Sequence, residues 1–181
     1  MPNIFESCQF INEGLFDKFK KSRSDLSKRK RGEKNDIKEV SYTEFTSILR
    51  DMEYIRGKIA EAMRRDAEKY RESYPDGVIE ERDANYWKQY IRKMKTCKPN
   101  MFCYMPYDYD DDDFDADSID NVMDTIYNAA EQLGFRFNDK DQYAFSEPNN
   151  KYPNIEIFVY DDADLNHIGF TISTFEKVTI K

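Results

Sequence analysis

The most regular pattern of apolar and polar positions lies between residues 41 and 73. Apolar side chains recur there at steps of three and four residues, which is the spacing of a helix with one buried face. Ser41 and Glu44 have the spacing of a capping box, in which a hydroxyl and a carboxylate bind the first free N–H groups of a helix. Turn-forming residues follow at 74–77, so we predict that this helix ends near residue 73. Its apolar stripe consists of Phe45, Ile48, Leu49, Met52, Ile55, Ile59, Ala62 and Met63.

A second helix is predicted over residues 80–95. Ala84, Trp87, Ile91 and Met94 share its inner face, again at helical spacing. The turn at 74–77 leaves a short connection between the two helices. We therefore expect them to pack against each other as an αα-hairpin.

A third helix is predicted after residue 117, and the spacing of apolar residues changes beyond it. Asp117 or Ser118 can cap this helix, and Gly134 suits the left-handed residue that ends one. Stretches rich in aromatic and β-branched residues, which are typical of strands, then follow at 135–137, 143–146, 154–161, 167–174 and 177–181. The C-terminal part is therefore predicted to be one helix packed on a small meander.

The two longest of these stretches, 154–161 and 167–174, are separated by a short polar linker and predict an antiparallel hairpin. Apolar residues recur at every second position in both, as expected for strands with one face in a core. The core faces would carry Ile155, Ile157, Val159, Ile168, Phe170 and Ile172.

Together these elements predict the α+β class: an N-terminal helical hairpin with an amphipathic leader, then one helix packed on a small antiparallel β-sheet. We divide the chain into 1–38 (amphipathic segment and basic arm), 39–98 (helical hairpin), 99–117 (aromatic and acidic connector) and 118–181 (helix and β-meander). The connector is too apolar for a plain linker. It is either a core or edge strand of the sheet, which we prefer, or a segment that docks on a partner.

The net charge of the chain is -8, but its charges are strongly segregated. Residues 18–34 contain nine basic and two acidic residues, whereas residues 108–120 contain eight aspartates and no basic residue. Blocks of like charge favour solvated loops or arms. The basic arm can also bind phosphates or an acidic protein surface through Lys28, Arg29, Lys30 and Arg31. The aspartate run predicts an acidic face formed by Asp108, Asp110, Asp111, Asp112, Asp113, Asp115 and Asp117.

The aspartate run does not fit a calcium-binding loop. Read as an EF-hand from Asp108, it has Asp113 where the loop needs glycine and Ile119 where it needs glutamate. We therefore interpret it as a solvated acidic loop and predict no metal site and no cofactor. An alternative use of these charges is to imitate the phosphates of DNA and occupy a DNA-binding host protein.

Candidate catalytic residues are few. His167 is the only histidine, and Cys8, Cys97 and Cys103 have neither a metal-binding nor a disulfide spacing. Cys103 with His167 is the remaining pair of nucleophile and base, and no local cysteine signature supports it. The six glycines form no phosphate-binding loop. We therefore expect a protein without enzymatic activity, and an enzyme that uses Cys103 and His167 is the last alternative.

An amphipathic segment precedes the basic arm. Its apolar residues can gather on one side of a short helix, with lysines at the edges. The stripe is too short, and its first half too poor in lysine, for a membrane-surface helix, so a protein is the expected partner. No apolar run is long enough to span a membrane, and the N-terminus lacks the features of a secretory signal. The predicted docking residues are Phe10, Ile11, Leu15, Phe16 and Phe19.

Ile11-Asn12-Glu13 followed by Gly14 resembles the site cut by the prohead maturation protease of large tailed bacteriophages, which favours Leu or Ile, any residue, then Glu before a small residue. In that family, internal head proteins carry a short N-terminal targeting peptide that is removed in the assembling capsid. The resemblance covers residues 1–14 and implies cleavage between Glu13 and Gly14. Residues 59–62 match the same pattern inside the first predicted helix, where folding should protect them.

The function implied is that of a non-catalytic virion-associated protein of a tailed phage, structural or packaged in the head, that docks through its N-terminal segment. The alternative is a small acidic binding protein that inhibits a host factor by presenting the acidic face. Expected partners are a capsid protein or a host factor, with non-specific nucleic-acid contact through the basic arm and no membrane. The expected location is the virion or the host cytoplasm.

Overall fold

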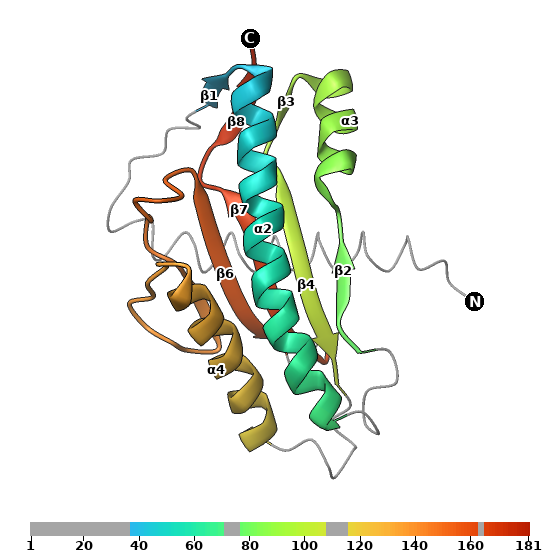
Figure 1. The fold of residues 1–181 in the computed structure, drawn as a ribbon, viewed down its shortest axis with the longest axis vertical. Coiled ribbons are helices and arrows are strands. Elements are labelled where there is room, and N and C mark those ends of the chain that lie inside the picture. Colours follow the sequence, from blue (N-terminus) through green and yellow to red (C-terminus); the bar gives the residue numbers. More distant parts are fainter. Residues whose placement is uncertain (1–36, 71–76, 108–115, 163–164) are drawn as a thin grey trace, which may run out of the picture. The chain divides into compact units, whose positions relative to one another are not determined.

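The computed structural model describes residues 37–70, 77–107, 116–162 and 165–181. The chain divides into two compact units, Met1–Asn35 and Asp36–Lys181, and all described residues belong to the second. Figure 1 shows this second unit as a layer of helices in front of a β-sheet. The fold of the second unit is therefore a two-layer arrangement.

The described residues include three α-helices: α2 (Tyr42–Ala67), α3 (Ala84–Met94) and α4 (Ala116–Gln132). The predicted capping box begins α2, because the Glu44 N–H donates to Ser41 Oγ and the Ser41 N–H donates to Glu44 Oε2. A single 3-10 turn, η1 (Glu68–Tyr70), follows α2. Asp83 caps α3 by accepting a hydrogen bond from the Tyr86 N–H at 2.9 Å. Both helices thus begin where a short polar side chain satisfies a free backbone donor.

Five antiparallel strands form the main sheet, in the order β2-β4-β7-β6-β5. They are β2 (Ile79–Glu81), β4 (Asn100–Pro106), β5 (Tyr143–Phe145), β6 (Ile155–Asp162) and β7 (His167–Thr174). A smaller sheet has the order β1-β8-β3. In it, β8 (Lys177–Ile180) runs parallel to β1 (Ile37–Val40) and antiparallel to β3 (Thr96–Cys97).

The hydrophobic core lies between the helices and one face of the main sheet. Figure 1 shows α2 crossing the sheet, with α3 beside its first half and α4 beside its second half. α3 runs antiparallel to α2, because the Ala84 N–H donates to Glu53 and the Arg92 guanidinium donates to the Tyr42 hydroxyl. The core side chains of the main sheet are Met101, Cys103, Met105, Ala144, Ile155, Ile157, Val159, Ile168, Phe170 and Ile172.

The structure confirms the predicted α+β class and many of its elements. All predicted stripe residues of α2 are buried except Ala62, which is half-buried. Gly134 follows α4 with a φ of +89°, the left-handed conformation expected after a helix. In the β6–β7 hairpin, Ile157 pairs with Ile172 and Val159 with Phe170, so the predicted faces both point into the core.

Three predicted boundaries and one predicted strand were wrong. α4 already begins at Ala116, so Asp117 and Ser118 lie inside this helix and do not cap it. α2 ends at Ala67 rather than near residue 73. The second helix begins at Ala84 rather than at residue 80, because Ile79–Glu81 pair with β4 and Arg82 then turns the chain with a φ of +57°. The stretch 135–137 contributes an isolated bridge between Phe137 and Ser146 instead of a strand. For residues 79–81 and for the stretch 135–137, pairing with distant residues overrides the local pattern.

Two predicted strands have neighbours that the sequence did not indicate. The stretch 177–181 was expected to extend the meander, but β8 leaves it and pairs with β1 and β3. β4, from the predicted connector, is an interior strand between β2 and β7, which confirms the strand interpretation of that stretch. The main sheet therefore contains strands from each of the segments 39–98, 99–117 and 118–181.

Candidate functional site

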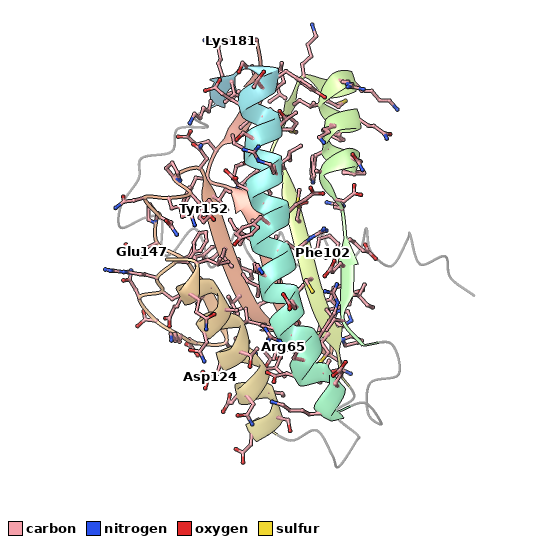
Figure 2. The ribbon with its side chains drawn as sticks, viewed as in Figure 1. Arg65, Phe102, Asp124, Glu147, Tyr152 and Lys181 are labelled. Atoms are coloured by element: carbon pink, nitrogen blue, oxygen red, sulfur yellow. The ribbon has the colours of Figure 1, made fainter. Side chains whose placement is uncertain are left out.

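Aromatic side chains line the face of the main sheet opposite the helices. Strand register places them in two neighbouring rows, each crossing β4, β7, β6 and β5 in turn. The rows are Phe102, Thr171, Phe158, Phe145 and Tyr104, Gly169, Tyr160, Tyr143. We call the six rings in these rows the aromatic face; Phe102, on β4, is labelled in Figure 2.

The rings of the aromatic face contact one another. The ring centroids of Phe145 and Phe158 are 4.4 Å apart, and those of Phe158 and Tyr160 are 5.7 Å apart. Phe102 and Tyr104 stack at 6.2 Å on β4. Such pairs contribute about 0.5–1.5 kcal/mol each beyond the area that they bury. The aromatic face is therefore a packed layer and not a set of isolated rings.

The aromatic face is more buried than the solvated face of an ordinary sheet. Phe102, Tyr104, Phe158 and Tyr160 expose only 9%, 7%, 5% and 4% of their surface, although none of them belongs to the core between helices and sheet. Burial also raises the pKa of the Tyr160 hydroxyl. An antiparallel sheet with one face in water carries polar residues on that face. This sheet has apolar, buried side chains on both faces.

Two carboxylates border the aromatic face at the ends of β6. Glu156 lies 3.5 Å from Lys98 Nζ and accepts a hydrogen bond from the Ser173 hydroxyl at 3.4 Å. Asp162 is 3% exposed and accepts from the Leu165 N–H at 3.3 Å. Both charges are therefore satisfied by neighbours, as burial requires.

Asp161 lies on the other face of β6, beside the core. The Tyr107 hydroxyl donates a hydrogen bond to its carboxylate. Burial raises the pKa of Asp161, and the hydrogen bond from Tyr107 opposes that rise. The pair ties the residue after β4 to β6 at the turn end of the β6–β7 hairpin.

His167 stands at the edge of the aromatic face, opposite Pro106 on one side and Asp162 on the other. Its ring centroid is 4.5 Å from that of Tyr104. Burial lowers the pKa of His167 below its ordinary value of 6.5, although the negative charge of Asp162 acts in the opposite direction. The imidazole is therefore neutral over a wider pH range than an exposed histidine.

A pH titration should reveal the lowered pKa of His167. Because the folded protein disfavours the charged imidazole, the unfolded chain binds the proton first as the pH falls through 6.5. The free energy of unfolding should therefore decrease between pH 6.5 and the lower pKa of the folded state, and His167→Gln should lack this part of the pH dependence. NMR titration of the single histidine and urea unfolding at several pH values measure the two effects. A folded-state pKa at or above 6.5 would contradict the prediction.

The structure contradicts the pairing of Cys103 with His167. Cys103 pairs with Phe170 and points into the core, whereas His167 contacts Tyr104 on the aromatic face. The main sheet separates the two side chains, since neighbouring strand positions alternate between faces. Burial also raises the pKa of both described thiols, that of Cys97 to about 12. The thiols are therefore protonated and poorly nucleophilic near neutral pH.

Most residues singled out from the sequence lie outside the described residues. This holds for the docking residues from Phe10 to Phe19, for Glu13 and Gly14, for the basic arm and for the aspartates from Asp108 to Asp115. Asp117 is described: it lies in the first turn of α4 and is exposed. The predicted docking and cleavage sites therefore stay predictions.

Within the described ranges, no three His, Cys, Asp or Glu side chains lie together so as to hold a metal ion. No helix in this part of the chain has the length and apolar character needed to span a membrane.

No protein-family model, curated protein or solved structure matches the chain. Packed rings of this kind also occur at the centres of protein–protein interfaces.

The sequence interpretation missed the aromatic face, although the sequence contains its signal. Three strands each carry two aromatic residues at positions i and i+2, the spacing that puts both on one face. These pairs are Phe102 and Tyr104, Tyr143 and Phe145, and Phe158 and Tyr160.

Proposed function

We propose that the protein is a non-catalytic, virion-associated protein of a tailed phage that docks on a partner protein through its N-terminal amphipathic segment. The observation that carries the proposal is the division of the chain: Met1–Asn35 is a unit separate from Asp36–Lys181. A segment that serves as an address or docking element has to be separable from the folded body that it delivers. The basic arm belongs to the same N-terminal unit.

The chemistry of the described unit supports a binding role. Its two cysteines are buried and its histidine is half-buried, on the other face of the main sheet from Cys103. The aromatic face adds a second apolar layer to a unit that already has a core. These features favour stable packing and association over turnover of a substrate.

The proposal predicts that the protein in purified particles begins at Gly14. Cleavage after Glu13 removes the address, whereas the matching residues 59–62 should stay intact because they lie within α2, where Ile59 is fully buried. Mass spectrometry of purified particles measures the N-terminus. Glu13→Gln should abolish the cleavage, and Glu61→Gln, which changes the second match on the exposed side of α2, should have no effect.

Two outcomes would count against the proposal in different ways. A chain with an intact N-terminus in particles would contradict the cleavage but leave the virion association standing. Absence of the protein from purified particles would contradict the virion association itself.

One observation favours the second candidate, a small acidic protein that inhibits a host factor. α4 carries three exposed aspartates, Asp117, Asp120 and Asp124, on neighbouring turns. Asp124 is labelled on α4 in Figure 2. Affinity purification from the host should then recover a basic, DNA-binding protein, and changing the three aspartates to asparagine should abolish its recovery. Recovery of the same proteins by the variant would contradict this candidate.

A further inference from the structure

The outward face of α3 is a basic surface. Residues 84–98 contain five basic residues and no acid, in a protein whose net charge is -8. Lys88 and Arg92 are one turn apart on α3, Lys93 is next to Arg92, and Lys95 caps the helix. We call Lys88, Arg92, Lys93 and Lys95 the α3 cations.

The α3 cations are available to a ligand. Arg92, Lys93 and Lys95 are exposed and Lys88 is half-buried. No acidic side chain of the described ranges forms an ion pair with any of the four. Their charges are therefore compensated by solvent ions, which a polyanion can displace with a gain in entropy.

Two exposed tyrosines lie on α3 or beside it. Tyr42 exposes 38% of its surface, and the Arg92 guanidinium lies 5.7 Å from its ring centroid and donates to its hydroxyl at 3.1 Å. Tyr86 exposes 44% and stacks on Tyr90 with a centroid distance of 6.2 Å. Exposed tyrosines on a basic surface provide stacking surfaces for bases, and the cations provide charges for phosphates.

The rest of the outward face of α3 adds neutral hydrogen-bonding groups and no negative charge. Asn85 and Gln89 are exposed between the cations. The cations of the last turn also complement the helix dipole, but Lys88 lies in the middle of α3, where the dipole has little effect. The helix dipole therefore does not explain all four α3 cations. Solubility does not explain them either, because the net charge of -8 already keeps the protein soluble.

Acidic residues gather instead on α4, which carries Asp117, Asp120, Asp124 and Glu131 and no basic residue. Figure 1 shows α3 and α4 beside opposite halves of α2. The described unit thus has a basic end and an acidic end. An anionic ligand would be attracted to the basic surface of α3 and repelled by the acidic surface of α4.

We infer that the outward face of α3, together with Tyr42, binds single-stranded nucleic acid. The α3 cations contact successive phosphates, and Tyr42 and Tyr86 stack on bases. The binding is independent of base sequence, because these contacts recognise phosphates and the flat faces of bases, not base edges. This surface is distinct from the basic arm, which lies in the other unit of the chain.

The test uses the full-length chain with Lys28, Arg29, Lys30 and Arg31 changed to glutamine, so that the basic arm does not contribute. The probe is a fluorescein-labelled oligothymidylate of about 20 nucleotides, a length that exceeds the roughly 4–16 nucleotides of a typical single-strand site. Fluorescence anisotropy gives the affinity at several salt concentrations. Four phosphate contacts predict a slope of about -2.8 for log affinity against log salt, and hence a loss of about 50-fold between about 50 and 200 mM salt.

Two matched pairs of variants assign the binding to this surface. Changing the α3 cations to glutamine should abolish binding. The control variant has glutamine at the exposed Lys58, Arg65, Lys140 and Lys151, which removes the same total charge from other elements. This variant should keep most of the binding. Tyr86→Ala should weaken binding about fivefold or more. Tyr54→Ala, which removes a tyrosine on α2 that is 50% exposed, should not. Circular dichroism verifies that each variant is folded.

Each outcome decides the proposal. Loss of binding in the α3 variant together with retention in the charge-matched variant would support it. Equal loss in both variants, or no binding by the arm-neutralised chain at low salt, would overturn it. Equally tight binding of polyglutamate would show that an acidic protein surface is the ligand, and tighter binding of a duplex of the same length would exclude a single-strand site.

Discussion

Replacing Gly169 by alanine is expected to lower the free energy of unfolding by about 3 kcal/mol or more. A Cβ atom at this position would lie 2.4 Å from the Cys103 carbonyl oxygen and 2.8 Å from Tyr104 Cα. Both atoms belong to the backbone of β4, which pairs with β7 along its whole length. The methyl group can be accommodated only if these central strands separate. Urea unfolding followed by circular dichroism measures the loss.

Gly57→Ala is the matched control for this substitution. It adds the same methyl group in the interior of α2, where no other atom lies within 4 Å of the new Cβ. Alanine should therefore stabilise the protein by up to about 1 kcal/mol, because it favours the helix more than glycine does. If Gly169→Ala cost no more than Gly57→Ala, the close approach of β4 and β7 described here would be incorrect.

Phe170→Ala is expected to cost about 3–5 kcal/mol. Phe170 is fully buried on the core face of β7, between its pairing partners Cys103 on β4 and Val159 on β6. Removing the ring deletes buried apolar surface and leaves a cavity under the helices. Most domains have only about 5–15 kcal/mol of total stability, so the melting temperature should drop by at least about 10 °C. Thermal unfolding followed by circular dichroism measures the shift.

Two further variants serve as controls for Phe170→Ala. Phe170→Leu keeps much of the buried volume and should cost clearly less than Phe170→Ala. Tyr143→Ala removes a ring that is 42% exposed at the outer end of the aromatic face, and should cost no more than about 1 kcal/mol. A small loss for Phe170→Ala, similar to that of Tyr143→Ala, would show that the core does not lie between β7 and the helices.

Local signals in the sequence predicted the elements that depend on neighbouring residues. The start of α2 depends on Ser41 and Glu44, three positions apart, and the β6–β7 hairpin depends on two alternating stretches with a short linker. Both were predicted correctly. Hydrophobic period and capping residues suffice where the contacts are close along the chain.

The incorrectly predicted elements depend on residues far apart in the sequence. β2 is a strand because Ile79–Glu81 pair with β4, although the residues that follow favour a helix. β8 pairs with β1, about 140 positions earlier, and nothing in either short stretch specifies that partner. Sequence patterns define which face of a strand is apolar, but not which strand lies beside it.

The same limit applies to the candidate sites. Each aromatic pair of the aromatic face was visible in the sequence, but Phe102 and Phe158 lie in one row only because β7 comes between their strands. The α3 cations were visible as well, yet their lack of acidic partners depends on how α3 packs against α2. The aromatic face and the α3 cations could be identified only from the strand register and the exposure of side chains. Neither of these follows from the sequence alone.

The parallel pairing of β1 and β8 determines how the folded unit would bear mechanical load. β1 is the first strand of this unit and β8 the last, and the Lys181 N–H donates to the Val40 carbonyl beyond their paired residues. A force that pulls the chain apart from its two ends draws these strands in opposite directions along their length. The hydrogen bonds between them are then strained in shear, all at once, instead of opening one after another. The small sheet therefore acts as a clamp that resists extension of the protein by its ends.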